Sequence, residues 1–373
     1  MLTLFFYTLI DFIAILLVAI SDSANKVIKL SFIGNRYIHL SEFLYFISAV
    51  LLFMIVALRD NVGADFSIYA NAYLNIIHDD LNETEKNWLG IGYVILCNVI
   101  GVFAGNSYHW MFAVVAAITI ASFYIAFYLA NKQRTWSVTL FIGFCLYYQC
   151  FNQARQMLAV AICSLAYIAL MKKRTSVFII VVVIAMLFHS SAIVMMLLLI
   201  ANKIKFNVSK IFVFLFISIA SMIVFDIFVD LMSKSFYGMI YIGSEMYDVS
   251  FKTSVIINTV FRALLLMFCM FFYNKLIHNN EENRILINTG FICLFFQILT
   301  LKSYLFGRIT TYFFITYLFI MPRIFELICK HTVIRDRVVV KFLFGVSIMI
   351  YHYTYYFMVA KDSGYDKYDT FLF

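Results

Sequence analysis

Five charged or ionisable side chains stand out because they lie at the ends of apolar stretches or, for one of them, at a turn within such a stretch. An arginine near the middle of a bilayer costs about 2.5–3.5 kcal/mol on insertion scales, so an interaction should offset that cost. A guanidinium is permanently charged and binds phosphate through two parallel hydrogen bonds, which suits a lipid-linked diphosphate. The arginines could also stabilise such a diphosphate as a leaving group. The residues are Arg59, Asp65, Arg155, His189 and Arg308.

Two of these residues could act as a general base. Histidine titrates near neutral pH, which favours His189, in the sequence LFHSSA, for that role. Asp65 competes with it, although Asp65 could instead orient Arg59 through an ion pair or cap a helix that starts at Phe66. Ordinary explanations also exist, because an arginine at a helix end commonly extends to the headgroups and a lone histidine commonly packs. They are weakened when several such residues share one membrane face.

Arg262 lies midway along its apolar stretch, where Asp226 or Asp11 is available as a partner. No D-x-D pair and no His/Asp cluster at metal-ligand spacing stands out, so we expect neither a metal nor another cofactor. The seven cysteines include no C-x-x-C pair, so neither a zinc site nor a disulfide framework is predicted.

The composition indicates a membrane protein. The chain of 373 residues is 64% hydrophobic and 13% charged, with a mean hydropathy of +0.93, whereas soluble domains carry about 25% charged residues. Runs such as residues 177–187 do not alternate as the strands of a β-barrel would. The net charge of +8 would suggest nucleic acid in a soluble protein, but here the excess lies in short loops beside the bilayer. We therefore expect no nucleic-acid partner.

The apolar segments predict an all-α, polytopic bundle of about 10–12 membrane-spanning helices. We assign residues 1–373 to one integral membrane domain, because neither a repeat nor a low-complexity linker is evident. The first segment lacks the basic leading region of a signal peptide and is expected to be a transmembrane helix. The segments are residues 2–20, 41–58, 88–104, 110–130, 136–151, 155–171, 176–202, 211–232, 253–276, 284–301, 304–322 and 338–358.

Loop charge predicts the orientation. The basic loops at residues 172–174 and 323–341 are expected on the cytoplasmic side, and the acidic or mixed loops at 59–87 and 233–252 on the outer side. Two segments break this alternation. Residues 176–202 should overrun the bilayer or form two half-helices that turn near His189, and residues 88–104 should form a re-entrant or interfacial helix. Irregular backbone at membrane depth commonly lines a cavity, so an outward-facing cavity is predicted.

Four short patterns, in order along the chain, resemble the signatures of the EpsG/Wzy-type polysaccharide polymerases. They are R-x3-G-x-D-x3-Y at residues 59–69, N-x2-R-Q-x2-A at 152–159, F-H-x-S-A at 188–192 and R-x3-Y-F at 308–313. Ala64 replaces the small polar residue more usual in the first pattern. The resemblance implies a multi-pass inner-membrane glycosyltransferase of the GT-C type. Such enzymes join repeat units on undecaprenyl pyrophosphate, as donor and as acceptor, into O-antigen, capsule or exopolysaccharide at the periplasmic face. A chain-length regulator is an implied partner.

The resemblance also implies roles for the residues. Arg155 and Arg308 would hold the donor diphosphate, and Arg59 would assist or position the acceptor's diphosphate. His189 or Asp65 would take the proton of the acceptor hydroxyl as it attacks the anomeric carbon with inversion. Supporting or sugar-stacking side chains would be Tyr69, Gln156 and Tyr312.

Three other functions are possible for such a chain. A transporter or flippase of lipid-linked glycans would need inverted repeats and polar residues near the midplane, neither of which is evident. An O-antigen ligase would share the arginine chemistry but use a lipid A core as acceptor. A purely structural scaffold would explain neither the arginines nor the interrupted segments.

Overall fold

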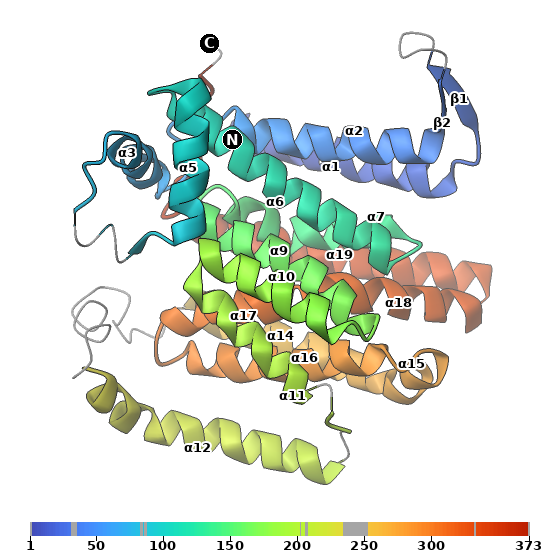
Figure 1. Cartoon of the computed structure of the whole chain (residues 1–373). Coiled ribbons are helices and arrows are strands. Elements are labelled where there is room, and N and C mark those ends of the chain that lie inside the picture. The colour runs from blue at the N-terminus through green and yellow to red at the C-terminus, as the bar shows by residue number, and fades with distance from the viewer. Residues whose placement is uncertain are drawn as a thin grey trace. The chain divides into compact units, whose positions relative to one another are not determined.

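The structure is a computed structural model that describes residues 2–30, 36–82, 85, 88–201, 203–205, 208–233, 253–331 and 333–371. Over these residues it is predominantly helical (Figure 1). Seven of the described helices are long and apolar enough to cross a membrane, and shorter apolar helices accompany them. The predicted class, a polytopic membrane helix bundle, is therefore confirmed. A short antiparallel hairpin of β1 (Val27–Leu30) and β2 (Arg36–His39) is an addition to the all-α prediction.

The chain divides into two compact units. Unit 1 contains residues 1–190 and 325–373, and unit 2 contains residues 191–324. This grouping reflects packing within each unit, and the assignment of residues 1–373 to one domain stays a prediction.

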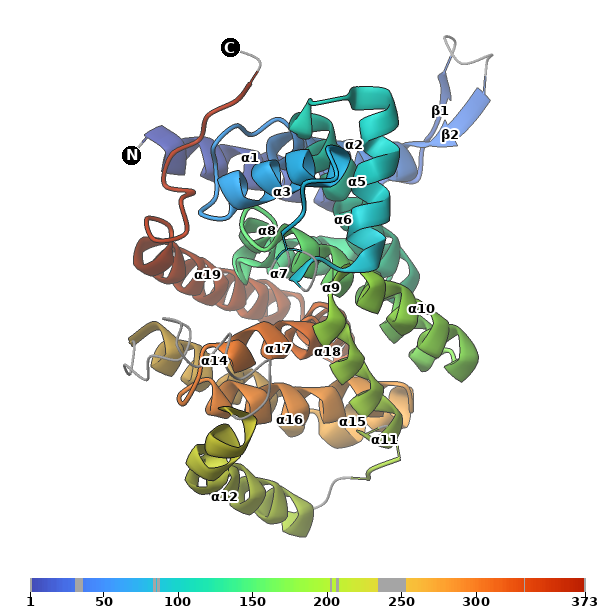
Figure 2. The ribbon, with the colours of Figure 1, turned by 60° about the vertical axis from the view of Figure 1, so that its left-hand side comes forward.

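In unit 1, α1 packs on α2, α2 on α6, α6 on α9 and α9 on α10. Figures 1 and 2 show α1 and α2 lying side by side, with α5 running across their direction. The prediction that residues 88–104 form an interfacial or re-entrant helix stays a prediction. The helices of this unit are α1 (Leu2–Ser23), α2 (Leu40–Ala57), α3 (Phe66–Ile77), α5 (Ile91–Ala104), α6 (Tyr108–Ala130), α7 (Arg134–Gly143), α8 (Leu146–Gln149), α9 (Ala154–Met171), α10 (Thr175–Phe188), the end of α18 (Thr316–His331) and α19 (Ile334–Val359).

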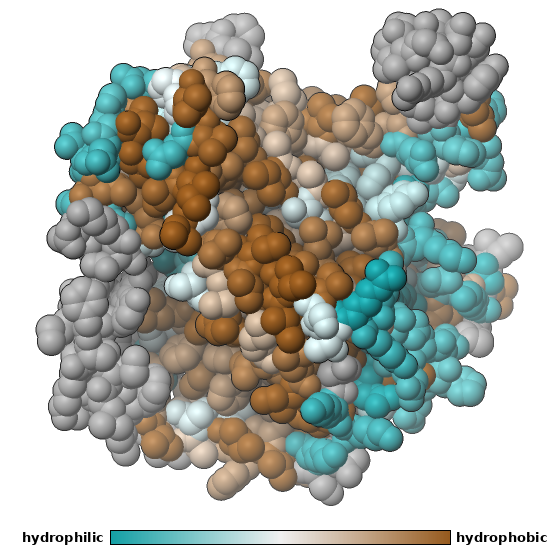
Figure 3. Space-filling model, in the orientation of Figure 1, coloured by the Kyte–Doolittle hydropathy of each residue, from teal (hydrophilic) through white to brown (hydrophobic). Residues whose placement is uncertain are grey.

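Helix α9 lies at the centre of unit 1, with nearly all of its side chains buried. Its sequence ARQMLAVAICSLAYIALM supplies small residues, which let neighbouring helices approach closely in membrane proteins. The surface over α6 and α10 is largely apolar, whereas hydrophilic residues gather near the turn between α9 and α10 (Figure 3). Lys172, Lys173 and Arg174 are exposed in that turn.

A buried ion pair fastens α1, α2 and α7 at the end of α2 that lies away from the first motif. Arg134 donates from Nε to Asp22 at 2.9 Å and from Nη2 to the hydroxyls of Ser21 and Ser41. The other Asp22 oxygen accepts from the backbone N–H and the hydroxyl of Thr135. A buried pair requires such additional hydrogen bonds to offset the loss of hydration.

Two of the predicted segments are interrupted. Helix α10 ends at Phe188, and His189 is extended (φ −151°, ψ 113°) before a 3-10 helix, η1 (Ser190–Met196), begins. The predicted break near His189 is therefore confirmed. Residues 136–151 were expected to form one span, but α7 ends at Gly143 and Cys145 adopts a left-handed conformation (φ 58°) before α8.

Unit 2 is built around α16, which contacts α11, α12, α14, α15 and α17. Phe296 of α16 stacks in parallel on Phe313 of α17, with 5.5 Å between ring centroids. The helices of this unit are α11 (Leu197–Ala201), α12 (Val208–Ser233), α14 (Thr253–Phe271), α15 (Tyr273–Asn279), α16 (Asn283–Leu299), α17 (Leu305–Phe314) and the start of α18.

Arg262 is buried on α14, and its guanidinium carbon lies 4.4 Å from the centre of the Phe314 ring. An aromatic face is a recognised partner for a desolvated cation. The predicted partner Asp11 accepts a hydrogen bond from Tyr148, and the side chain of Asp226 lies outside the described residues.

Candidate functional site

The first motif lies in the turn between α2 and α3. Gly63 has φ +102°, a conformation that favours glycine, and a Cβ there would overlap the carbonyl oxygen of Phe151. The turn therefore lies directly against the residues that precede α9 and begin the second motif. Helix α3 starts at Phe66 with Asp65 in the N-cap position, but the Asp65 side chain makes no capping hydrogen bond. Capping thus does not explain Asp65, and its role as a base stays a prediction.

Arg59 is enclosed, with only 1% of its surface exposed. Its Nη1 donates to the carbonyl of Val56 at 2.7 Å, and its guanidinium carbon lies 4.7 Å and 5.4 Å from the ring centres of Phe112 and Phe151. Its Nε has no hydrogen-bond partner among the described residues. Burial lowers the pKa of Arg59 to about 10, so the group keeps its charge at neutral pH.

Arg155 lies on the first turn of α9, with 3% of its surface exposed. Its Nη1 donates to the carbonyl of Trp88 at 2.8 Å, and its guanidinium carbon lies 3.9 Å from the centre of the Trp88 ring. Tyr69, the last residue of the first motif, stacks on the same indole with 5.9 Å between centroids. Trp88 therefore joins the first motif to the second. Gln156, next to Arg155, is buried as well.

The third motif begins beside the start of α5. A Cβ at Gly90 would overlap the carbonyl oxygen of Leu187 and lie 2.9 Å from that of Phe188. His189, the next residue, is half-buried, and its backbone N–H donates to Ala185. Three of the four motifs therefore meet at one end of unit 1, around residues 88–93.

The C-terminal tail is a further part of this end of unit 1. The N–H groups of Gly63 and Ala64 donate to the carbonyls of Gly364 and Ser363, both at 2.9 Å, and Asp60 N–H donates to a tail carbonyl as well. The hydroxyl of Tyr368 donates to the carbonyl of Ile55, at the end of α2. The tail thus holds the backbone of the first motif in place.

The fourth motif lies in unit 2. Arg308 is half-buried on the first turn of α17, and Tyr312, one turn later, is fully buried. The Tyr312 hydroxyl accepts a hydrogen bond from Ser191 at 3.2 Å. Ser191 is the serine of the third motif, so these two motifs are also in contact.

Sequence reasoning missed Trp88, Tyr93 and the tail. The glycines at the start of residues 88–104 marked that segment as unusual, and this was the only available signal. Tail residues 361–371 carry no pattern that indicates pairing with a turn so far away in the sequence. Within the described residues, no group of three or more His, Cys, Asp or Glu side chains is placed to hold a metal ion.

The fold and the grouped motifs define a multi-pass helical membrane protein with cationic groups beside an aromatic cluster at one end of unit 1. The chain belongs to the EpsG family, whose family model matches residues 42–370. It is therefore a protein of polysaccharide biosynthesis of the polymerase type. The match includes all four motifs and most of the C-terminal tail. No curated protein and no solved structure matches this chain.

Proposed function

We propose that this protein is a membrane glycosyltransferase that polymerises undecaprenyl-pyrophosphate-linked oligosaccharide repeats into O-antigen or a related surface polysaccharide. It acts at the periplasmic face of the bacterial inner membrane, with inversion and without a metal. The observation that carries the proposal is the meeting of three family motifs around Arg155 and Trp88.

Arg155 has the properties of a diphosphate-binding cation. It is buried and its Nε has no partner among the described residues. A buried donor without a partner is costly, so an incoming anion that accepts its hydrogen bond gains free energy. A guanidinium can bind phosphate oxygens with two parallel bonds, and it stabilises the charge that develops as the diphosphate leaves. Arg308 is proposed as a second cation for the donor diphosphate, and Arg59 as the cation that assists or positions the acceptor's diphosphate.

The reaction forms one glycosidic bond and breaks another. The acceptor hydroxyl attacks the anomeric carbon of the donor sugar, and the bond from that carbon to the diphosphate oxygen breaks. The electron pair leaves with the diphosphate, and the hydroxyl proton passes to the base. His189 and Asp65, both partly exposed, are the candidates for that base. Tyr69, Gln156 and Tyr312 are proposed as supporting residues.

The decisive experiment is polymerisation in liposomes. The full chain is supplied with purified undecaprenyl-pyrophosphate repeat units and a chelator, and the products are resolved on a gel. We expect a ladder that survives chelation, disappears with Arg155→Ala and persists with Arg174→Ala, an exposed arginine at the start of α10. Folded protein that gives no ladder but moves the lipid-linked repeat across the bilayer would instead be a transporter. Transfer to a lipid A core alone would identify a ligase.

A further inference from the structure

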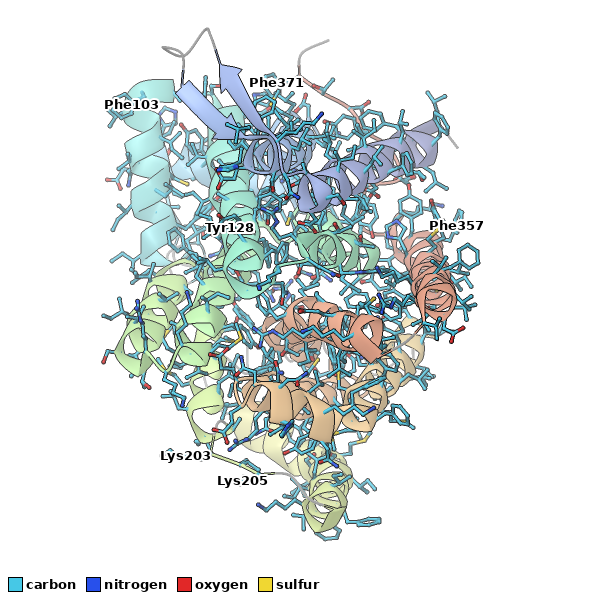
Figure 4. The ribbon with its side chains drawn as sticks, turned by 90° about the vertical axis from the view of Figure 1, so that its right-hand side faces the viewer. Phe103, Tyr128, Lys203, Lys205, Phe357 and Phe371 are labelled. Carbon is cyan, nitrogen blue, oxygen red and sulfur yellow. The ribbon has the colours of Figure 1, made fainter. Side chains whose placement is uncertain are left out.

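An apolar groove lies between α2 and α6, with a volume of about 490 Å³. Small residues form part of its lining, among them Ala49 on α2 and Ala117 and Ala121 on α6. Tyr128, near the last turn of α6 (Figure 4), lines the end of the groove that lies away from the first motif. Pockets of this size commonly hold small ligands.

The polar atoms of the groove wall are already satisfied within the protein. The Tyr45 hydroxyl donates to the carbonyl of Tyr124 at 2.7 Å, and the Tyr124 hydroxyl pairs with the Ser48 hydroxyl at 2.8 Å. Arg134, whose guanidinium carbon lies 4.6 Å from the Tyr45 ring centre, is neutralised by Asp22. The groove therefore offers a ligand almost only carbon surface, and a hydrocarbon chain is the chemistry that fits.

The other end of the groove leads toward the first motif. Ile120 lines both the groove and a small cavity that adjoins it, and the second cavity is lined by Arg59 and Val56. Arg59 is buried there with an Nε that has no partner among the described residues. A charge therefore lies beyond one end of the hydrocarbon groove, at the end where the motifs gather. This polarity matches a lipid whose charged head lies at the motifs and whose tail runs along α2 and α6.

We propose that the α2–α6 groove binds the isoprenoid tail of the lipid-linked substrate. The proposal rests on the proposed function, because that function supplies a polyprenyl diphosphate. Burying the tail against α2 and α6 would fix the direction from which the diphosphate reaches the motifs. One methylene gained or lost in a hydrophobic pocket changes kcat/KM by roughly 10–200-fold.

The test compares two substrates with the same diphosphate and sugars, one on undecaprenyl and one on the much shorter geranyl chain. Ala121→Phe and Ala117→Phe each fill the groove from exposed positions, so neither disturbs the buried core. Val183→Phe, at an exposed position of α10 outside the groove, is the matched control. We expect the groove variants to lower kcat/KM roughly tenfold for the undecaprenyl substrate only. An equal effect on both substrates, or none on either, overturns the groove proposal and leaves the polymerase function intact.

A second measurement does not depend on turnover. Undecaprenyl diphosphate with a photoreactive group on its tail is crosslinked to the full chain in liposomes, and the labelled peptides are identified. We expect crosslinks on α2 and α6. Added undecaprenyl diphosphate without the photoreactive group should abolish these crosslinks by competition, whereas excess phosphatidylethanolamine should leave them unchanged. If the phospholipid also abolished the crosslinks, the groove would be a site for bilayer acyl chains and the proposal would be overturned. Crosslinks only at other helices would overturn it as well. Crosslinking at the groove without any ladder would count against the polymerase function alone.

Discussion

At the scale of single residues, Arg155 is held by an aromatic ring rather than by an acid. Among the described residues its partners are the carbonyl and ring of Trp88 and, at 5.6 Å, the ring of Tyr93. A carboxylate would neutralise the guanidinium and compete with an incoming phosphate. An indole positions the group, contributes about 2 kcal/mol when desolvated, and leaves the charge available. The contact therefore suits a residue that must bind an anion during turnover.

Arg155→Lys tests whether the geometry of this group matters in addition to its charge. Lysine keeps the charge but loses the planar fork that binds two oxygens at once. If Arg155 stabilises the leaving diphosphate, we expect the rate to fall roughly 100-fold, the typical cost of one lost transition-state donor. Initial rates in liposomes measure it, with Arg174→Lys as the control. Chain lengths and rates equal to those of the natural protein would show that Arg155 does not clamp the diphosphate.

We expect Trp88 to position Arg155. Two substitutions, one that removes the aromatic ring and one that keeps a ring, distinguish this role from a purely structural one. Trp88→Ala removes the ring beneath Arg155 and beside Tyr69, and we expect kcat to fall about tenfold with a smaller change in KM. Trp88→Phe keeps an aromatic face and should recover most of that loss. Steady-state kinetics on both variants measure the split. If Phe and Ala behave alike while both fold normally, ring stacking does not position Arg155.

At the scale of helices and strands, sequence patterns predicted what depends on local composition. The apolar runs predicted the long helices, and the run at 176–202 was too long for a single span, which exposed the break at His189. The break at Cys145 and the tail on the first motif were missed. They depend on backbone contacts between residues far apart in the sequence, such as Ala64 with Ser363, and no periodicity records such contacts. Trp88 was missed because its partners, Arg155 and Tyr69, are likewise distant from it in the sequence.

Gly364 tests the importance of the tail as an element. It has φ +68°, and a Cβ there would lie 2.9 Å from the Ala64 nitrogen. Gly364→Ala should therefore strain the turn by about 1–3 kcal/mol and push the tail off the first motif. We expect a lower Tm in detergent and a weaker ladder.

The control for this change is Gly345→Ala. Gly345 lies within α19, and nothing comes within 4 Å of a Cβ added there. Alanine in a helix interior is about 0.5–1 kcal/mol more favourable than glycine, so the Tm should stay or rise. If Gly364→Ala leaves both Tm and ladder unchanged, the tail does not hold the motif.

At the scale of the whole molecule, the second motif and the start of the third lie at the opposite end of α9 and α10 from the basic turn of unit 1. Helix α9 begins beside Arg155 and ends at the exposed turn of Lys172, Lys173 and Arg174, and α10 returns from that turn to His189. A helix of this length extends about 27 Å, close to the thickness of the hydrocarbon core. Since basic turns favour the cytoplasmic side, the motifs should face outward.

Single cysteines can test this orientation in spheroplasts. Ser67→Cys on α3 reports the motif end and Lys172→Cys reports the basic end, and both positions are exposed. Six of the seven natural cysteines are buried, and Cys329 is partly exposed. Cys329→Ser is therefore included in both variants, so that this thiol does not contribute background labelling. A membrane-impermeant maleimide should label Ser67→Cys in intact spheroplasts and Lys172→Cys only after permeabilisation. The reverse pattern would place the motifs in the cytoplasm, where a repeat unit already delivered to the outer leaflet could not reach them, and would contradict polymerisation at the periplasmic face.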